Sequence, residues 1–134
     1  MPTALKRSLL IIDIAMILYW LISFCALMGW FELPKSMMYG GYGTPIIDAW
    51  NWSFAPLDIL FSLIGLLSVR AAQRGDPQWR YLAIVSLTVT FCAGFMAVTF
   101  WMIRGEFDIS WWIPNLILMA IPLFWVHRLI RTVT

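Results

Sequence analysis

Hydrophobic residues fill four long stretches of the chain, and polar residues gather in the segments between them. The stretches cover residues 9–30, 54–69, 82–103 and 111–129. Each is within reach of the roughly 17 to 25 residues with which a helix crosses the hydrocarbon core of a bilayer. Inside lipid, a single span must be helical because only a helix satisfies its own backbone hydrogen bonds. The pattern therefore predicts an all-α fold, an integral membrane four-helix bundle that forms one membrane domain over residues 1–134.

Three connections of different character separate the stretches. Residues 32–50 contain glycines and prolines that interrupt a helix, so this segment predicts a surface loop. Residues 70–80 are basic, and residues 104–110 form a tight turn that is acidic on balance. Four crossings and these connections account for nearly every residue, which leaves no separate catalytic domain. Any active or binding site must lie between the helices or at their ends.

Basic residues are distributed unevenly over the two ends of the predicted bundle. Two of the nine, Lys35 and Arg104, fall at one end. The other seven fall at the opposite end: Lys6, Arg7, Arg70, Arg74, Arg80, Arg128 and Arg131. Since cytoplasmic loops carry the excess of lysine and arginine, the distribution predicts that both termini are cytoplasmic.

The composition agrees with a membrane protein and narrows the function classes. Of the 134 residues, 62% are hydrophobic and 12% are charged, and a soluble domain carries about twice that charged share. The net charge of +2 comes without a polybasic run, so nucleic-acid binding has no support. The partners that we expect are membrane lipids and a small apolar or lipid-like ligand, and association into a homo-oligomer stays open.

Motifs for a metal or a cofactor are absent from the sequence. The glycine-rich run 39–43 is not followed by the Lys-Ser/Thr pair of a phosphate-binding loop. Cys25 and Cys92 lie in apolar stretches and form no C-x-x-C pair. Metal-ligand spacing and a Ser/His/Asp nucleophile set are missing as well. We therefore expect no metal and no cofactor.

Asp13 lies in the first apolar stretch, about one turn inside its cytoplasmic end. An ionisable residue costs roughly 2.5 to 3.5 kcal/mol at the middle of a span on insertion scales, so it needs a partner or a purpose. Lys6 and Arg7 are close enough in the sequence to reach it. We interpret Asp13 as one half of an interfacial ion pair and keep it as a secondary candidate for a functional residue.

Asp58 lies near the outer end of the second stretch and begins a narrow polar face. Asp58, Ser62 and Gly65 recur at helical spacing. The third stretch offers a matching stripe, which consists of Thr90, Gly94, Ala97, Trp101 and Arg104. Small residues on both stripes would allow the two helices to approach closely.

An ion pair between Asp58 and Arg104 is the simplest way to satisfy both charges, because antiparallel helices bring them to the same depth. Asn115 of the fourth stretch is a plausible third member. Trp101, Trp111 and Trp112 would wall the resulting outer pocket. Convergent polar groups inside an aromatic wall are typical of a small-ligand site. The alternative is a structural pair that ties three helices together.

Several short motifs in the last three stretches occur together: Phe54-Ala55-Pro56-Leu57-Asp58, Gly65-Leu66, Phe100-Trp101, Arg104-Gly105-Glu106-Phe107-Asp108 and Trp111-Trp112-Ile113-Pro114-Asn115-Leu116. This combination resembles the YvaD-type family of small bacterial membrane proteins. The resemblance implies four spans and a location in the bacterial inner (plasma) membrane. It implies no activity, and it is less clear over the first helix and the long outer loop.

The sequence is compatible with three functions. The first is a binding or transport-accessory protein whose candidate ligand-binding residues are Asp58, Arg104, Asn115, Trp101, Trp111 and Trp112. The second is an intramembrane enzyme that acts on an apolar or isoprenoid-like substrate, with a carboxylic acid as proton donor and tryptophans that stabilise a developing cation. The third is a small multidrug-type exporter, although the uneven loop charge argues against a dual-topology dimer.

Overall fold

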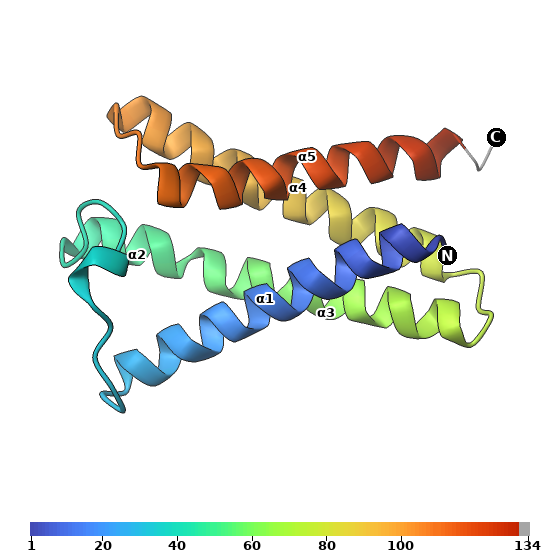
Figure 1. The fold of residues 1–134 in the computed structure, drawn as a ribbon, viewed down its shortest axis with the longest axis horizontal. Helices are drawn as coiled ribbons and strands as arrows, with labels where there is room; N and C mark the ends of the chain where they lie inside the picture. Colours follow the sequence, from blue (N-terminus) through green and yellow to red (C-terminus); the bar gives the residue numbers. More distant parts are fainter. Residues whose placement is uncertain (132–134) are drawn as a thin grey trace.

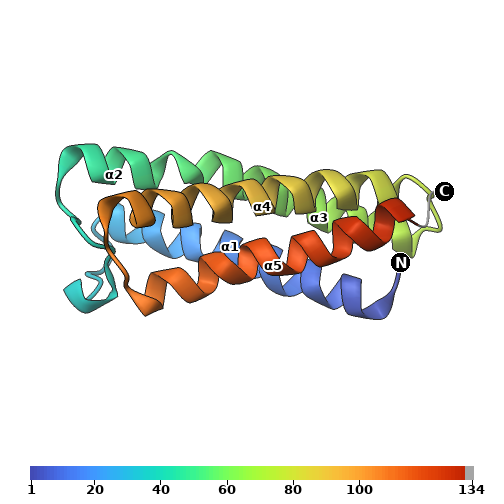
Figure 2. The same ribbon diagram turned by 90° about the horizontal axis from the view of Figure 1, so that it is seen from above.

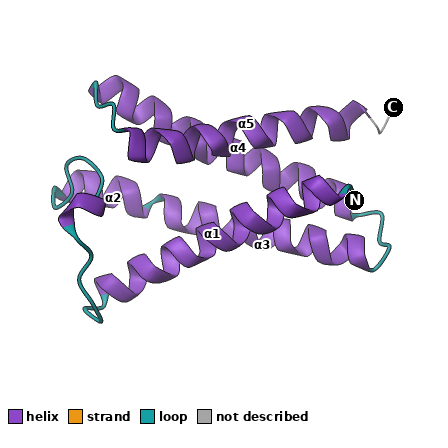
Figure 3. Ribbon diagram, in the orientation of Figure 1, coloured by secondary structure: helices purple, strands orange, loops and turns teal. Residues whose placement is uncertain are grey.

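The computed structural model describes residues 1–131 and contains four long helices (Figures 1 and 3). These are α1 (Thr3–Leu27), α3 (Phe54–Gln73), α4 (Trp79–Arg104) and α5 (Ile109–Arg131). No strand occurs among the described residues. All four helices are long and apolar enough to cross a membrane, the second of them together with a short helix that precedes it. The predicted all-α fold with four helices is therefore confirmed.

The four long helices run alternately up and down, and each packs on its neighbour in the chain (Figures 1 and 2). α1 packs on α3, α3 on α4, and α4 on α5. α1 and α5 make few contacts: near the end where the chain begins, the Trp125 indole donates to Ser8 Oγ at 3.3 Å, and toward the other end Tyr19 meets Trp111 edge to face at 6.5 Å. Toward the other end, where α2 lies, α1 and α5 diverge (Figure 1).

Small side chains line the buried face of α4, the helix that contacts both α3 and α5. Ala83, Ser86, Thr90, Gly94 and Ala97 are all buried on this helix, at spacings of three and four residues. Small residues are typical of helix packing in membranes, because the backbones gain van der Waals contact when they approach closely.

Large apolar side chains are exposed along every long helix. Ile11 of α1 is 70% exposed, and Leu63, Val85 and Phe124 on the other three long helices are each about half exposed. A surface of this kind is far more apolar than a protein in water displays. It matches the surroundings of a lipid bilayer.

The two ends of the bundle differ in charge as the sequence predicts. α1 and α4 begin, and α3 and α5 end, at the N-terminal end, which therefore carries the seven basic residues grouped above. Lys35 and Arg104 lie at the α2 end. The orientation of these ends relative to the cytoplasm stays a prediction.

The segment 32–50 is more ordered than a loop. It contains a 3₁₀ turn, η1 (Lys35–Met37), and the short helix α2 (Pro45–Trp52). Proline fits the first position of a helix because its missing N–H would have no partner there, and Asp48 in the first turn complements the helix dipole. The long helices also extend beyond the predicted stretches at several ends, most clearly at the start of α1.

Candidate functional site

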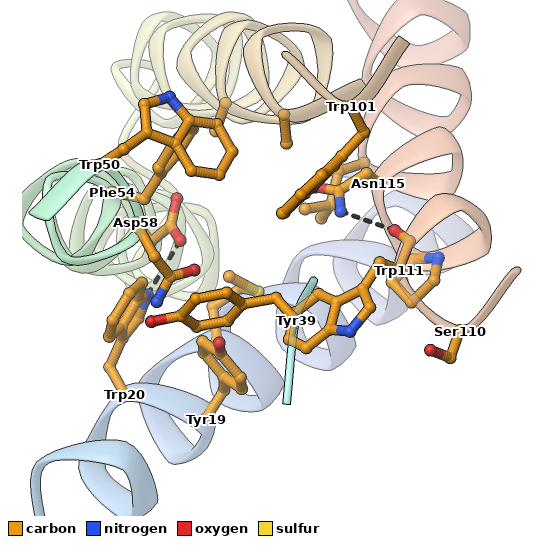
Figure 4. A pocket seen from close by; sticks show the side chains of 16 residues that line it. Tyr19, Trp20, Tyr39, Trp50, Phe54, Asp58, Trp101, Ser110, Trp111 and Asn115 are labelled. Carbon is orange, nitrogen blue, oxygen red and sulfur yellow. Dashed lines mark hydrogen bonds between the residues drawn. The ribbon is translucent and has the colours of Figure 1, made fainter. Parts of the chain in front are cut away.

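A cavity of about 290 Å³ lies at the α2 end, between α1, α3, α4 and α5 (Figure 4). We call it the aromatic pocket, because seven aromatic side chains line it: Tyr19, Trp20, Tyr39, Trp50, Phe54, Trp101 and Trp111. The polar residues in its wall are Asn51, Asp58, Ser110 and Asn115, and the remaining lining residues are Met16, Ala93, Ala97, Pro114 and Leu118.

Asp58 supplies the only carboxylate among the described residues that line the pocket. It lies one turn after the start of α3 and is 4% exposed. Its Oδ2 accepts a hydrogen bond of 2.9 Å from the Trp20 indole of α1, while its Oδ1 has no hydrogen-bond partner among the described residues. A buried polar atom without a partner is rare in proteins and often marks a functional position. Oδ1 is therefore the atom of this pocket that could accept a hydrogen bond or a positive charge from a ligand.

Contacts between rings hold the aromatic wall in place. Trp50 of α2 stacks on Phe100 of α4 with ring centroids 3.7 Å apart, and it meets Trp101 edge to face at 5.6 Å. On the other side, Tyr39 meets Trp111 of α5 edge to face at 5.9 Å. Aromatic pairs in such geometries contribute about 0.5–1.5 kcal/mol beyond the area that they bury. The pocket is thus bounded by rings that support each other.

Tyr39 comes from the connection after η1 and closes the pocket between α1 and α5. Its hydroxyl donates a hydrogen bond of 2.7 Å to Asp48 Oδ1, which also accepts from the Gly43 amide at 3.1 Å. Burial, together with the neighbouring Asp48 carboxylate, raises the pKa of the Tyr39 hydroxyl. The hydroxyl consequently keeps its proton and remains a donor at neutral pH.

A second cavity of about 450 Å³ lies next to the aromatic pocket, under the segment that contains η1. Four side chains line both cavities: Tyr19, Tyr39, Asn51 and Trp111. They form the wall that the pocket and this outer space share. A molecule that enters from the α2 end would pass this wall.

The structure does not contain the predicted ion pair between Asp58 and Arg104. Arg104 Nη2 lies 2.6 Å from Glu106 Oε1, two residues further along the chain, and Asp58 bonds to Trp20 instead. The prediction was wrong because Glu106 can reach the guanidinium within the turn between α4 and α5. Arg104 therefore does not line the aromatic pocket.

The other predicted site residues divide into two groups. Asp58, Trp101, Trp111 and Asn115 line the aromatic pocket, and the Asn115 amide donates to the Trp111 carbonyl oxygen at 2.7 Å. Trp112 lies outside this pocket, where its indole donates to the Glu106 carbonyl oxygen at 2.9 Å. The structure brings four of these residues together, and their role in ligand binding stays a prediction.

Asp13 is not part of an interfacial ion pair. Because α1 begins at Thr3, Asp13 lies ten residues inside the helix, about 15 Å from its start. Its side chain is fully buried, and within residues 1–131 neither carboxylate oxygen has a hydrogen-bond partner. The carboxylate faces Gly65 of α3, where an added Cβ would collide with it. Asp13 does not line the aromatic pocket.

The two stripes of small residues do not simply face each other. Asp58, Ser62 and Gly65 are buried on α3, as predicted, but Gly65 makes room for Asp13 of α1. Gly94 of α4 faces α5, since a Cβ added there would lie 2.7 Å from the Asn115 carbonyl oxygen. The close approach at Gly94 is therefore between α4 and α5, and not between α3 and α4.

Sequence reasoning missed Trp20, Tyr39 and Trp50 as residues of the site. For Trp20 a signal was present, because it lies well inside the first apolar stretch and a buried indole N–H usually finds an acceptor. Asp58 is the acceptor that could have been assigned to it. The glycine-rich run that begins at Tyr39 is expected to cover the outer pocket, but a loop assignment for residues 32–50 places neither the Tyr39 nor the Trp50 side chain against a particular helix.

No group of three or more histidine, cysteine or acidic side chains that could hold a metal ion occurs in residues 1–131. The cysteines Cys25 and Cys92 are both free. What the site offers is one unpaired carboxylate oxygen, amide groups, and the faces of aromatic rings. This inventory suits non-covalent binding of a largely apolar molecule, with one polar contact at Asp58.

Comparison with known proteins confirms the resemblance that the motifs indicate. A family of unknown function, DUF5360, matches residues 5–134. The chain is also 39% identical over 127 residues to the uncharacterized protein YvaD of Bacillus subtilis (strain 168). The matched region covers 95% of this chain and 92% of that protein. No solved structure matches the chain.

Proposed function

The chain belongs to DUF5360, a family of unknown function, and we propose from the geometry of the aromatic pocket that this protein binds a small, largely apolar ligand there. The observation that carries this proposal is the unpartnered Oδ1 of Asp58, buried in the wall of a cavity of about 290 Å³. Ligand sites combine an apolar or aromatic lining with a few placed polar groups, and their volumes begin near this size.

The proposal includes a place for the protein in the cell. Four helices that are long and apolar enough to cross a membrane, with exposed apolar side chains along them, support a multi-pass protein of the bacterial plasma membrane. The charge difference between the ends supports cytoplasmic termini. The aromatic pocket then opens toward the outer face, where it would take its ligand from the outer leaflet or the medium.

Binding can be tested with N-phenyl-1-naphthylamine, a neutral aromatic probe that accepts excitation energy from tryptophan. With the full chain in nanodiscs, we expect saturable energy transfer from the tryptophans that line the pocket. Ala97 of α4 is buried in the pocket wall, so Ala97→Phe fills the cavity and should abolish the saturable component.

The matched control is Val85→Phe, which places the same side chain on an exposed part of α4 away from the pocket. This variant should bind the probe like the wild type. Equal signals from all three proteins would show that the probe only partitions into the lipid, and the proposal would then fail.

A second candidate function, an intramembrane enzyme, is favoured by the same oxygen. A carboxyl group with a free Oδ1 beside aromatic faces could donate a proton to an apolar substrate and stabilise the cation that forms. Mass spectrometry of molecules recovered after incubation separates the two functions. A binding protein returns its ligand unchanged, whereas an enzyme returns an isomer or an adduct.

A further inference from the structure

The charge of the aromatic pocket is unbalanced. Asp58 is its one carboxylate, and no lysine, arginine or histidine is among the described residues that line it. Arg104, the basic residue predicted to pair with Asp58, is held by Glu106 through two hydrogen bonds of 2.9 and 2.6 Å. An ionised carboxylate in this cavity consequently finds no cationic side chain among the described residues that line it.

The hydrogen bonds of Asp58 leave one direction open for a partner. Oδ2 is occupied by the Trp20 indole, whereas Oδ1 is buried and has no donor. Figure 4 shows Asp58 at the edge of the space that Trp50, Trp101 and Tyr39 surround. A group that reaches Oδ1 through this space would also meet the rings.

Aromatic faces carry negative electrostatic potential, so a cation near several of them is attracted without any formal charge on the protein. Cages of aromatic rings recognise substituted ammonium groups in this way. A metal ion is a poorer match, because no cluster of metal ligands occurs in the described part of the chain. An anion would lie beside the Asp58 carboxylate, which repels it.

We propose that the ligand of the aromatic pocket is an organic cation, a substituted ammonium whose charge lies between Asp58 Oδ1 and the rings of Trp50, Trp101 and Tyr39. This inference rests on the proposed function of the same pocket and names its ligand class. The ammonium could belong to a free amine or to the headgroup of a zwitterionic lipid, because both present the same positively charged group.

Two probes of the same shape test the charge directly. Benzyltrimethylammonium and neopentylbenzene differ in one atom, a nitrogen that carries the positive charge and a carbon that does not. Affinities are measured by tryptophan fluorescence on the full chain in nanodiscs of phosphatidylglycerol. We expect the cation to bind at least about tenfold more tightly than the hydrocarbon, and the anion phenylmethanesulfonate to show no saturable binding.

Two variants locate the effect. Asp58→Asn keeps an acceptor for Trp20 and removes the charge, so it should weaken binding of the cation about tenfold and leave neopentylbenzene within about twofold. Asp13→Asn is the matched control, since it removes a buried carboxylate that does not line the pocket. Its affinities should stay within about twofold of the wild type.

The outcomes separate this inference from the function on which it rests. If neither probe binds, both fail. If the cation and the hydrocarbon bind equally to the wild type, the pocket stands and the cation inference falls, whether or not Asp58→Asn folds. Inclusion of phosphatidylethanolamine in the nanodiscs distinguishes the sources. If the pocket takes a lipid headgroup, this lipid should compete and weaken the apparent affinity for benzyltrimethylammonium. If the pocket takes only free amines, the apparent affinity should not change.

Discussion

The hydrogen bond between Trp20 and Asp58 joins two groups that would each be costly to bury alone. Trp20→Phe removes the indole donor and leaves Asp58 with two unpartnered oxygens, so we expect the free energy of unfolding to fall by about 1–3 kcal/mol. Asp58→Leu removes the acceptor. Unfolding of both single variants and of the double variant in detergent measures the coupling, which should be at least about 0.5 kcal/mol.

Arg104 provides the control for this cycle. Because its ion pair is with Glu106, Arg104→Gln combined with Asp58→Leu should change stability by the sum of the two single effects, within about 0.3–0.5 kcal/mol. Strong coupling between Asp58 and Arg104, and none between Asp58 and Trp20, would contradict the arrangement described here.

Gly65 is the position at which α3 accommodates Asp13. A methyl group there collides with the Asp13 carboxylate and lies 2.9 Å from Ser86 Oγ. Gly65→Ala should therefore destabilise the protein by about 1–3 kcal/mol, the usual range for overpacking. Thermal unfolding in detergent measures the change.

The double variant Gly65→Ala with Asp13→Ala tests whether this contact is the cause. Removal of the carboxylate should restore part of the stability that Gly65→Ala loses. If Gly65→Ala unfolds like the wild type, α1 and α3 do not approach closely at this position.

At the scale of elements, Gly94 controls how closely α4 approaches α5. A larger side chain there meets the Asn115 carbonyl oxygen and Leu118, and we expect Gly94→Leu to cost about 1–3 kcal/mol. Gly105 is the comparison, since nothing lies within 4 Å of a Cβ added there and only its φ of +70° opposes a side chain. Gly105→Ala should cost about 1 kcal/mol. A Gly94→Leu variant as stable as the wild type would mean that Gly94 faces lipid.

The long helices could be predicted because each is a continuous apolar run that a bilayer requires to be helical. α2 could not, because its helix signals, Pro45 and Asp48, stand directly after a glycine-rich run that predicts a loop. Partners across the bundle were harder still. Spacing places Asp58 and Gly65 on one face of α3, but it does not say that α1 approaches that face with Trp20 and Asp13.

At the scale of the whole molecule, the seven basic residues at the N-terminal end predict its side of the membrane. Reporter fusions within residues 40–44 and after Thr134, which lies outside the described residues, should report opposite sides, with the second in the cytoplasm. Reversal of the charge difference by substitution at the N-terminal end is the control, since it should lower the fraction of correctly oriented protein. Reporters on the same side would contradict four crossings.

Of the candidate site, the sequence predicted the depth and four of the lining residues, because tryptophans and a buried aspartate near one end of a span are unusual on their own. It did not predict the true partner of Arg104, since Glu106 lies in a turn whose conformation brings the two side chains together. The pocket also depends on how far α1 and α5 diverge toward the α2 end (Figure 1), and residue spacing along one helix does not give the distance between two helices.

The wall that the two cavities share should affect the rates of binding and release more than the affinity. Tyr39 is held in this wall by its hydrogen bond to Asp48, and we expect it to move when a molecule passes from one cavity to the other. Tyr39→Phe removes this bond and keeps the ring, so association and dissociation rates should both rise severalfold while Kd stays nearly constant. Stopped-flow measurement with benzyltrimethylammonium would show the effect, and a change in Kd alone would contradict it. The residence time of a bound molecule then depends on the hydroxyl of Tyr39, whereas its affinity depends on the Tyr39 ring together with Asp58 and the other rings of the pocket.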